Sequence, residues 1–80
     1  MPLDLQIKLV AFKIAMDVTL KGMNRSPERC TRNLLELIES SYPEKIDFYD
    51  KDALYATILG YCKNSDSKTA KETILNIITT

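Results

Sequence analysis

The N-terminal segment LDLQIKLVAFKIAMDVTLKG, Leu3 to Gly22, constrains the fold more than any other part of the chain. Its apolar and polar residues alternate, which is typical of a half-buried strand. The alternation slips at Leu9–Val10, however, and a strand this long would far exceed the ~3–10 residues of most strands. No Gly, Pro or Asn-Gly pair inside it offers a hairpin turn, and its Ala, Met and Lys residues favour helix. We therefore predict a helix from Leu3 to Lys21, ended by Gly22.

On a helix, the apolar residues of this segment fall on two opposite faces. The first face, which we name stripe A, consists of Leu3, Ile7, Val10, Ile14 and Val18. The second face, stripe B, consists of Leu5, Leu9, Phe12, Met16 and Leu20. A surface helix normally has one apolar stripe, so this helix must be covered on both sides. Either the other helices surround it, or one side meets a second chain; we predict stripe B as the apolar partner-binding surface.

The residues after this helix are typical of a second helix start. Ser26 is suited to accept hydrogen bonds from free N–H groups as the N-cap. Pro27 fits the first helical position, where its missing N–H costs nothing. We predict a helix from here to about Ser41, because Pro43 disfavours a helical conformation in the residue before it.

Residues 44–49 are predicted to form a connector, with Ile46 and Phe48 packed on the core. Asp50 is placed to cap a third helix, and the polar turn at 64–67 supplies the cap of a fourth, which runs to about Ile78. Short connections favour antiparallel neighbours. The sequence therefore predicts an all-α fold in which residues 1–80 form a single helical domain, either a small four-helix bundle or two stacked αα-hairpins.

The two halves of the chain also echo each other at an offset of 40 residues, as in Asn24 and Asn64. A repeated helix–turn–helix unit explains this echo, and so does chance, because any two amphipathic helices resemble each other. Both explanations are compatible with four helices.

The segment GYCKNSDSKTAKETI (60–74) resembles the turn between the two helices of a pentatricopeptide repeat, a helical-repeat family that binds single-stranded RNA. Such repeats often carry a G-Y-C-K-N-G-D turn and then an Ala, matched here by Ala70. The chain has Ser65 where the family has glycine, and the family's first-helix Tyr falls on Leu54, one residue from Tyr55. The array that solenoids need is also missing. We interpret the resemblance as convergent helix-hairpin chemistry and carry no RNA-reading residues over.

The residue types exclude several kinds of chemistry. Without histidine, the chain has no Ser–His or Cys–His nucleophile pair, and its two glycines cannot form a phosphate-cradling loop. The acids of residues 44–52 lack the spacing of a calcium loop. Two thiols alone cannot hold a structural zinc, so we predict Cys30 and Cys62 to be small buried hydrophobes, with a disulfide as the alternative. We predict no catalytic residues, no cofactor and no metal: the chain is not expected to be an enzyme.

Charge and hydropathy narrow the location and the partners. The 11 Lys and Arg residues balance the 11 Asp and Glu residues, which argues against a general binder of nucleic acid or anionic membranes. The first residues lack the pattern of a signal peptide, and no apolar run approaches the ~20 residues of a membrane span. We therefore expect a cytoplasmic protein without a membrane segment.

The charges are nevertheless unevenly placed. Residues 21–32 hold four cations and one acid, whereas residues 36–52 hold six acids and two lysines. The four cations form a predicted basic patch of Lys21, Arg25, Arg29 and Arg32. A basic end and an acidic end suit the steering of a charged partner or of a second copy. Ordinary surface charge with pairs such as Arg32–Glu36 is the alternative.

Two functions follow as expectations. The first is a non-enzymatic protein–protein interaction module (an adaptor, inhibitor or regulator) that binds another protein or forms a homodimer through its first helix. The alternative is a small nucleic-acid-binding regulator that uses the basic turn and the start of the second helix, as helix-turn-helix proteins do.

Overall fold

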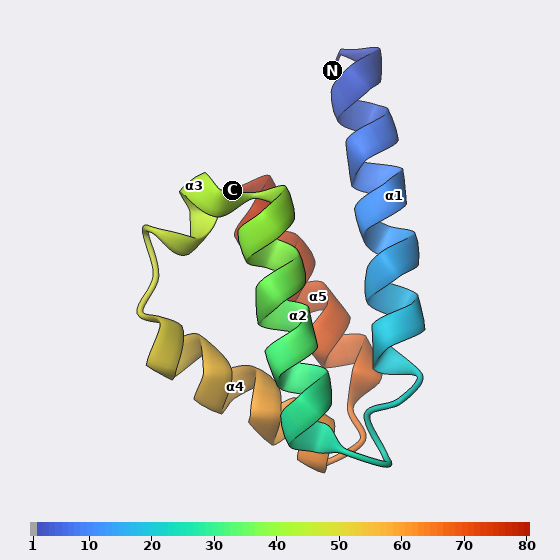
Figure 1. Cartoon of the computed structure of the whole chain (residues 1–80), viewed down its shortest axis with the longest axis vertical. Helices are drawn as coiled ribbons and strands as arrows, with labels where there is room; N and C mark the ends of the chain where they lie inside the picture. Colours follow the sequence, from blue (N-terminus) through green and yellow to red (C-terminus); the bar gives the residue numbers. More distant parts are fainter. Residues whose placement is uncertain (1) are drawn as a thin grey trace.

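The computed structural model describes residues 2–80, and this part of the chain is all α, without strands (Figure 1). The helices are α1 (Leu3–Leu20), α2 (Pro27–Ser41), α3 (Pro43–Ile46), α4 (Lys51–Lys63) and α5 (Ser67–Thr79). The all-α class is thus confirmed, and the four long helices lie where the sequence predicts them. The single turn of α3 is additional: Pro43 ends α2 and also provides the first residue of a new helix, a position that suits proline.

The helices form two hairpins, α1–α2 and α4–α5, which α3 and the turn after it connect (Figure 1). Helix α2 lies at the centre, where it packs against α1, α3 and α4, and α4 packs in turn against α5. Helix α1 runs along one side, and its first turns extend beyond the rest of the molecule (Figure 1). This arrangement is compatible with both bundle descriptions, and it leaves one long flank of α1 without a neighbour.

The core draws apolar side chains from all five helices and from the turn after α1. Its buried apolar residues are Phe12, Met16, Leu20, Met23, Cys30, Leu34, Ile38, Ile46, Leu54, Ile58, Cys62, Ala70, Ile74, Ile77 and Ile78. Met16, Leu34 and Ile58 are fully enclosed, and full burial of such a side chain contributes roughly 1.5–3 kcal/mol. At the edge of the core, the Phe12 ring meets the Tyr42 ring edge-on, with 5.3 Å between centroids.

Local hydrogen bonds fix the ends of the helices. The carboxylate of Asp50 accepts from the Asp52 backbone N–H at 2.9 Å, and that of Asp66 accepts from the Thr69 N–H at 3.0 Å. Both predicted caps are thereby confirmed. Ser26 does occupy the N-cap position of α2, but its side chain makes no capping hydrogen bond there. The prediction of a side-chain cap at Ser26 is therefore wrong.

The two hairpin turns are tied to each other at Ser65. This residue has a φ of 57°, in the left-handed region that costs a non-glycine residue roughly 1–2 kcal/mol. Its hydroxyl donates to the side-chain oxygen of Asn24 at 2.6 Å. The hydrogen bond offsets part of the strain, and it joins the α1–α2 turn to the α4–α5 turn.

Candidate interaction surface

The two apolar faces of α1 have opposite surroundings. Phe12, Met16 and Leu20 of stripe B are at most 7% exposed and belong to the core, while Leu9 is half-buried and Leu5 is exposed. We therefore correct the predicted partner surface: most of stripe B is used inside the chain itself. The physical reason is that stripe B carries the large Phe and Met side chains, whose burial gains the most.

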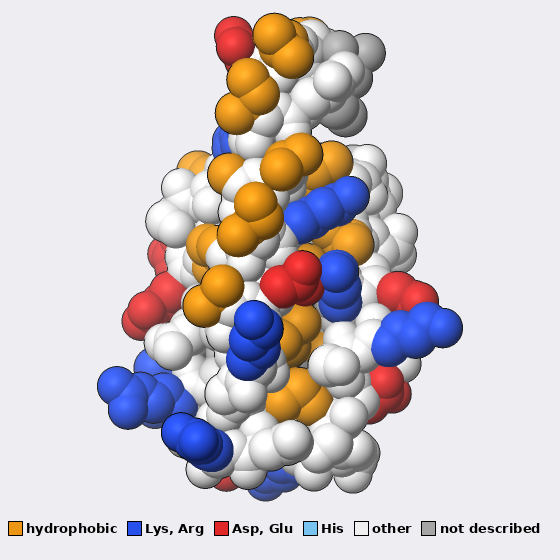
Figure 2. Space-filling model, turned by 90° about the vertical axis from the view of Figure 1, so that its right-hand side faces the viewer, with side chains coloured by type: hydrophobic (Ala, Val, Ile, Leu, Met, Phe, Trp, Pro, Cys, Tyr) orange, Lys and Arg blue, Asp and Glu red, His pale blue; other side chains and the backbone are white. Residues whose placement is uncertain are grey.

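Stripe A is the face left in water. Its members Leu3, Ile7, Val10, Ile14 and Val18 are between 56% and 69% exposed. Figure 2 looks onto this side of the molecule and shows apolar side chains following α1 down from its free end. Soluble monomers rarely present contiguous apolar patches beyond a few hundred Å². The other described helices therefore cover most of stripe B of α1 but leave stripe A exposed.

The first turns of α1 form an overhang, which we define as residues 3–8. Every residue of the overhang is exposed, and Leu9 is the first of the helix to be partly covered. Beneath it lies a groove of about 220 Å³, lined by Leu5 and Leu9 together with Tyr42 and Ile78. The overhang thus carries apolar side chains on two sides, and the groove beside it combines apolar residues with Glu44, Lys45 and Thr79.

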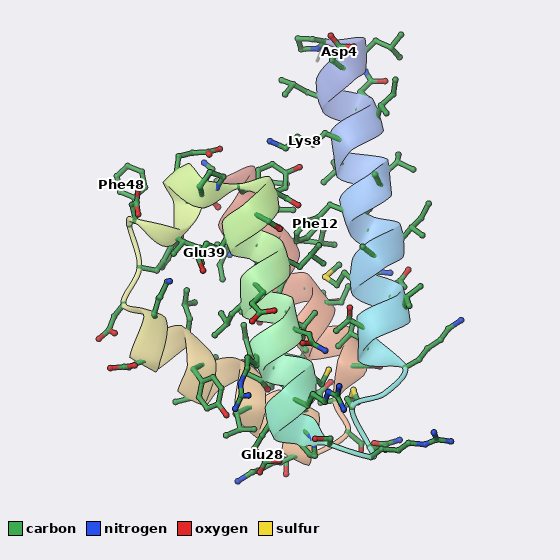
Figure 3. The ribbon with its side chains drawn as sticks, viewed as in Figure 1. Asp4, Lys8, Phe12, Glu28, Glu39 and Phe48 are labelled. Atoms are coloured by element: carbon green, nitrogen blue, oxygen red, sulfur yellow. The ribbon has the colours of Figure 1, made fainter. Side chains whose placement is uncertain are left out.

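One contact steadies the base of the overhang. The Lys8 ammonium lies 4.3 Å from the centroid of the Tyr42 ring, a cation–π contact. Burial, together with nearby Glu44, raises the pKa of the Tyr42 hydroxyl above its ordinary value, so this ring stays neutral. In Figure 3, Lys8 and Phe12 both point from α1 towards α2. These two side chains therefore lie away from stripe A.

Charged residues close stripe A at its C-terminal end. Asp17 lies beside Val18 and pairs with Lys71 of α5 at 3.0 Å. Lys21 follows on the helical line of Leu3 and Ile14, because eighteen residues make five turns. The apolar run is thus bounded by a carboxylate and an ammonium group.

The structure distributes the predicted basic patch over two places. Lys21, Arg25, Arg29 and Arg32 are all exposed. Lys21 lines a groove with Lys68 and Lys71 of α5, whereas Arg29 lines a separate hollow beside Thr19 and Asn33. Lys68 and Lys71 were missed because nothing in a single sequence brings residues so distant in the chain next to Lys21. That this patch binds a partner stays a prediction.

The turn after α3 differs from the predicted connector. Ile46 is buried as predicted, but Phe48 is 82% exposed, so its predicted packing on the core is wrong. The backbone N–H of Phe48 donates to the Lys45 carbonyl oxygen and that of Tyr49 to the Ile46 carbonyl oxygen. This tight turn directs Phe48 away from the core, and Figure 3 shows its ring at the edge of the molecule far from α1.

The two cysteines lie together inside the core as free thiols. The Cys62 Sγ lies 3.9 Å from that of Cys30, whose thiol donates to the Thr19 carbonyl oxygen at 3.4 Å. Burial raises the pKa of Cys30 to about 12, with the neighbouring Cys62 adding to the effect. Cys30 is therefore a thiol at neutral pH rather than a nucleophilic thiolate, and the prediction of buried hydrophobes is confirmed.

These features define an all-α helical protein with one apolar helix face in water. Comparison with protein-family models, with curated proteins and with solved structures finds no match for the chain. Within residues 2–80, three or more His, Cys, Asp or Glu residues nowhere gather in a way that could hold a metal ion. None of the described helices combines the length and the apolar character that crossing a membrane requires.

Proposed function

We propose that this chain is a non-enzymatic protein–protein interaction module that associates with a second copy of itself through stripe A of α1. The observation that supports the proposal is the exposure of five aliphatic side chains along one face of a helix whose opposite face lies in the core. Exposed apolar faces of this kind mark interaction sites in soluble proteins. An adaptor, an inhibitor or a regulator would each use such a surface.

The apolar side chains of stripe A give pairing a free-energy gain that can be compared with its cost. Full burial of a Val, Leu or Ile side chain gains ~1.5–3 kcal/mol, and each member of stripe A has more than half of its surface still to bury. Two copies of the stripe therefore gain on the order of 10 kcal/mol on pairing. Association costs about 4–15 kcal/mol in lost freedom. Because gain and cost are of similar size, we expect at most a moderate affinity, with dimers that form as the chain concentration rises.

Sedimentation analysis over a wide range of chain concentration tests the proposal. The mass of the wild type should rise from the 9.1 kDa of one chain towards that of two. Ile14→Asp places a charge in the middle of stripe A and should hold the mass at that of one chain. Its melting in dilute solution should stay close to that of the wild type, because Ile14 is 60% exposed.

The control is Lys13→Asp, which introduces a carboxylate at the neighbouring residue on the flank of α1. It changes the net charge by two, where Ile14→Asp changes it by one, and is therefore the stricter test of charge alone. This variant should still associate. A wild type that remains at the mass of one chain at the highest attainable concentration would show that the self-association is wrong.

A further inference from the structure

The order of residues along stripe A distinguishes between the ways in which two copies can pair. Leu3, Ile7, Val10 and Ile14 are spaced by four, three and four residues, the spacing of the seam positions of a coiled coil. The next two seam positions are Asp17 and Lys21. The seam is therefore apolar over four positions and charged over the following two.

A parallel pair in register would place each seam residue opposite its own copy. Asp17 would then face Asp17, and Lys21 would face Lys21, in consecutive layers. Facing like charges disfavour an arrangement. The Asp17 carboxylate, which pairs with Lys71 at 3.0 Å, would also lose water on the approach of a second helix. The parallel arrangement thus brings together the two ends that repel.

An antiparallel pair can avoid these contacts entirely. If Ile7 faces Val10 of the second copy, then Leu3 faces Ile14 and the pattern repeats in reverse. Four apolar layers result, built from side chains that are all more than half exposed in the single chain. In this register Asp17 and Lys21 lie beyond the start of the other helix, as does Val18, so no charged residue of α1 enters the seam.

Resting on the proposed self-association, we infer that two copies pair α1 antiparallel in this staggered register, with the two-fold axis between Lys8 and Leu9. Stripe A faces away from the core, so the two molecular bodies lie on outer sides of the helix pair and at opposite ends of it. The overhang of each copy, which extends beyond its own body (Figures 1 and 2), covers the middle of the other α1. The first turns of α1, which are exposed in a single chain, thus cover the exposed stripe A of the second chain.

Disulfide trapping with two single-cysteine additions, Leu3→Cys and Ile14→Cys, tests the register. In the antiparallel pair, residue 3 of one chain faces residue 14 of the other. Residue 3 of one chain and residue 3 of the other are displaced along the helix pair by eleven residues, or about 16 Å. The same displacement separates the two copies of residue 14. A disulfide needs Cα atoms within roughly 7 Å. Mild oxidation with diamide should therefore link the two variants when they are mixed and neither variant when it is alone.

Intact-mass measurement identifies the products when one variant is labelled with ¹⁵N. The label is needed because Leu and Ile are isomers, so the two unlabelled variants have the same mass. Wild-type protein under the same oxidation is the control for Cys30 and Cys62, which are buried, and it should give no linked dimer. Sedimentation of each variant under reducing conditions shows separately whether the chains associate.

The outcomes separate this inference from the proposal beneath it. A mixed disulfide as the main product supports the antiparallel register. Efficient linkage of Leu3→Cys to itself would overturn it in favour of a parallel pair. Chains that sediment as dimers but give no linkage in any mixture would also overturn it, while leaving self-association intact. Chains that sediment as monomers throughout would remove both.

Discussion

The two apolar faces of α1 have the same number and spacing of residues but opposite environments. Each has five apolar residues at the same spacing, yet stripe B supplies Phe12 and Met16 to the core while stripe A stays in water. The difference arises because the apolar faces of α2, α4 and α5 are already directed at one shared core, which has room for only one side of α1. The periodicity of a helix therefore shows that a face needs cover, and only the packing shows what provides it.

The largest expected effect comes from placing the same charge on each face. Phe12→Asp removes a ring that is 3% exposed and leaves a carboxylate in its place, next to Tyr42. We expect a loss of about 4 kcal/mol or more, which is comparable with the whole stability of a domain this small. Circular dichroism should show a chain that is largely unfolded at room temperature. Cooperative melting like that of Ile14→Asp would mean that the two faces do not differ as described.

A milder pair of truncations measures the same contrast without adding charge. Met16→Ala should lower the free energy of unfolding by roughly 2–5 kcal/mol, because Met16 is fully enclosed. Val10→Ala should change it by less than ~0.5 kcal/mol in dilute solution, since more than half of Val10 is exposed. Urea denaturation at low chain concentration gives both values. Equal losses for the two variants would contradict the assignment of the faces.

The smallest effect concerns a site away from both faces, the N-cap of α5. Hydrogen bonds from the Thr69 side chain and backbone N–H hold the pKa of Asp66 below its ordinary value, with help from Lys68. A carboxyl whose pKa is lower in the folded state stabilises the fold above its unfolded pKa, and this contribution disappears as the pH falls through the folded pKa. Asp66→Asn should therefore melt slightly below the wild type at neutral pH and level with it in acid.

Glu36→Gln, a change to an exposed carboxyl on α2, is the control for this comparison. Neither substitution should alter the mass measured by sedimentation, because neither residue belongs to stripe A. A melting difference for Asp66→Asn that persists unchanged in acid would mean that the carboxylate charge is not what caps α5.

Local signals in the sequence predicted the helices well. Pro27, Asp50 and Asp66 mark helix starts through backbone geometry and short hydrogen bonds, which act within a few residues and can be inferred from neighbours alone. The one-turn α3 was missed because the proline that ends α2 also suits the start of another helix.

The errors concern contacts between distant residues. Periodicity did not show which stripe of α1 the core accepts, since both stripes have the same spacing; the signal that distinguishes them is the larger Phe12 and Met16 side chains of stripe B. Phe48 was placed on the core from its apolar character, but the turn that follows Ile46 directs it outward. The meeting of Lys21 with Lys68 and Lys71 likewise depends on how the hairpins stack, to which the charge pattern along the chain gives no guide.

The overhang of α1 has a further consequence for how order is shared between molecules. Residues 3–8 have solvent on nearly every side, and a few turns of isolated helix are close to the limit of stability in water. If a second chain covers them, helix formation in these turns and association of the two chains become a single coupled equilibrium. The length of this helix then depends on both chains, and raising the protein concentration would lengthen it.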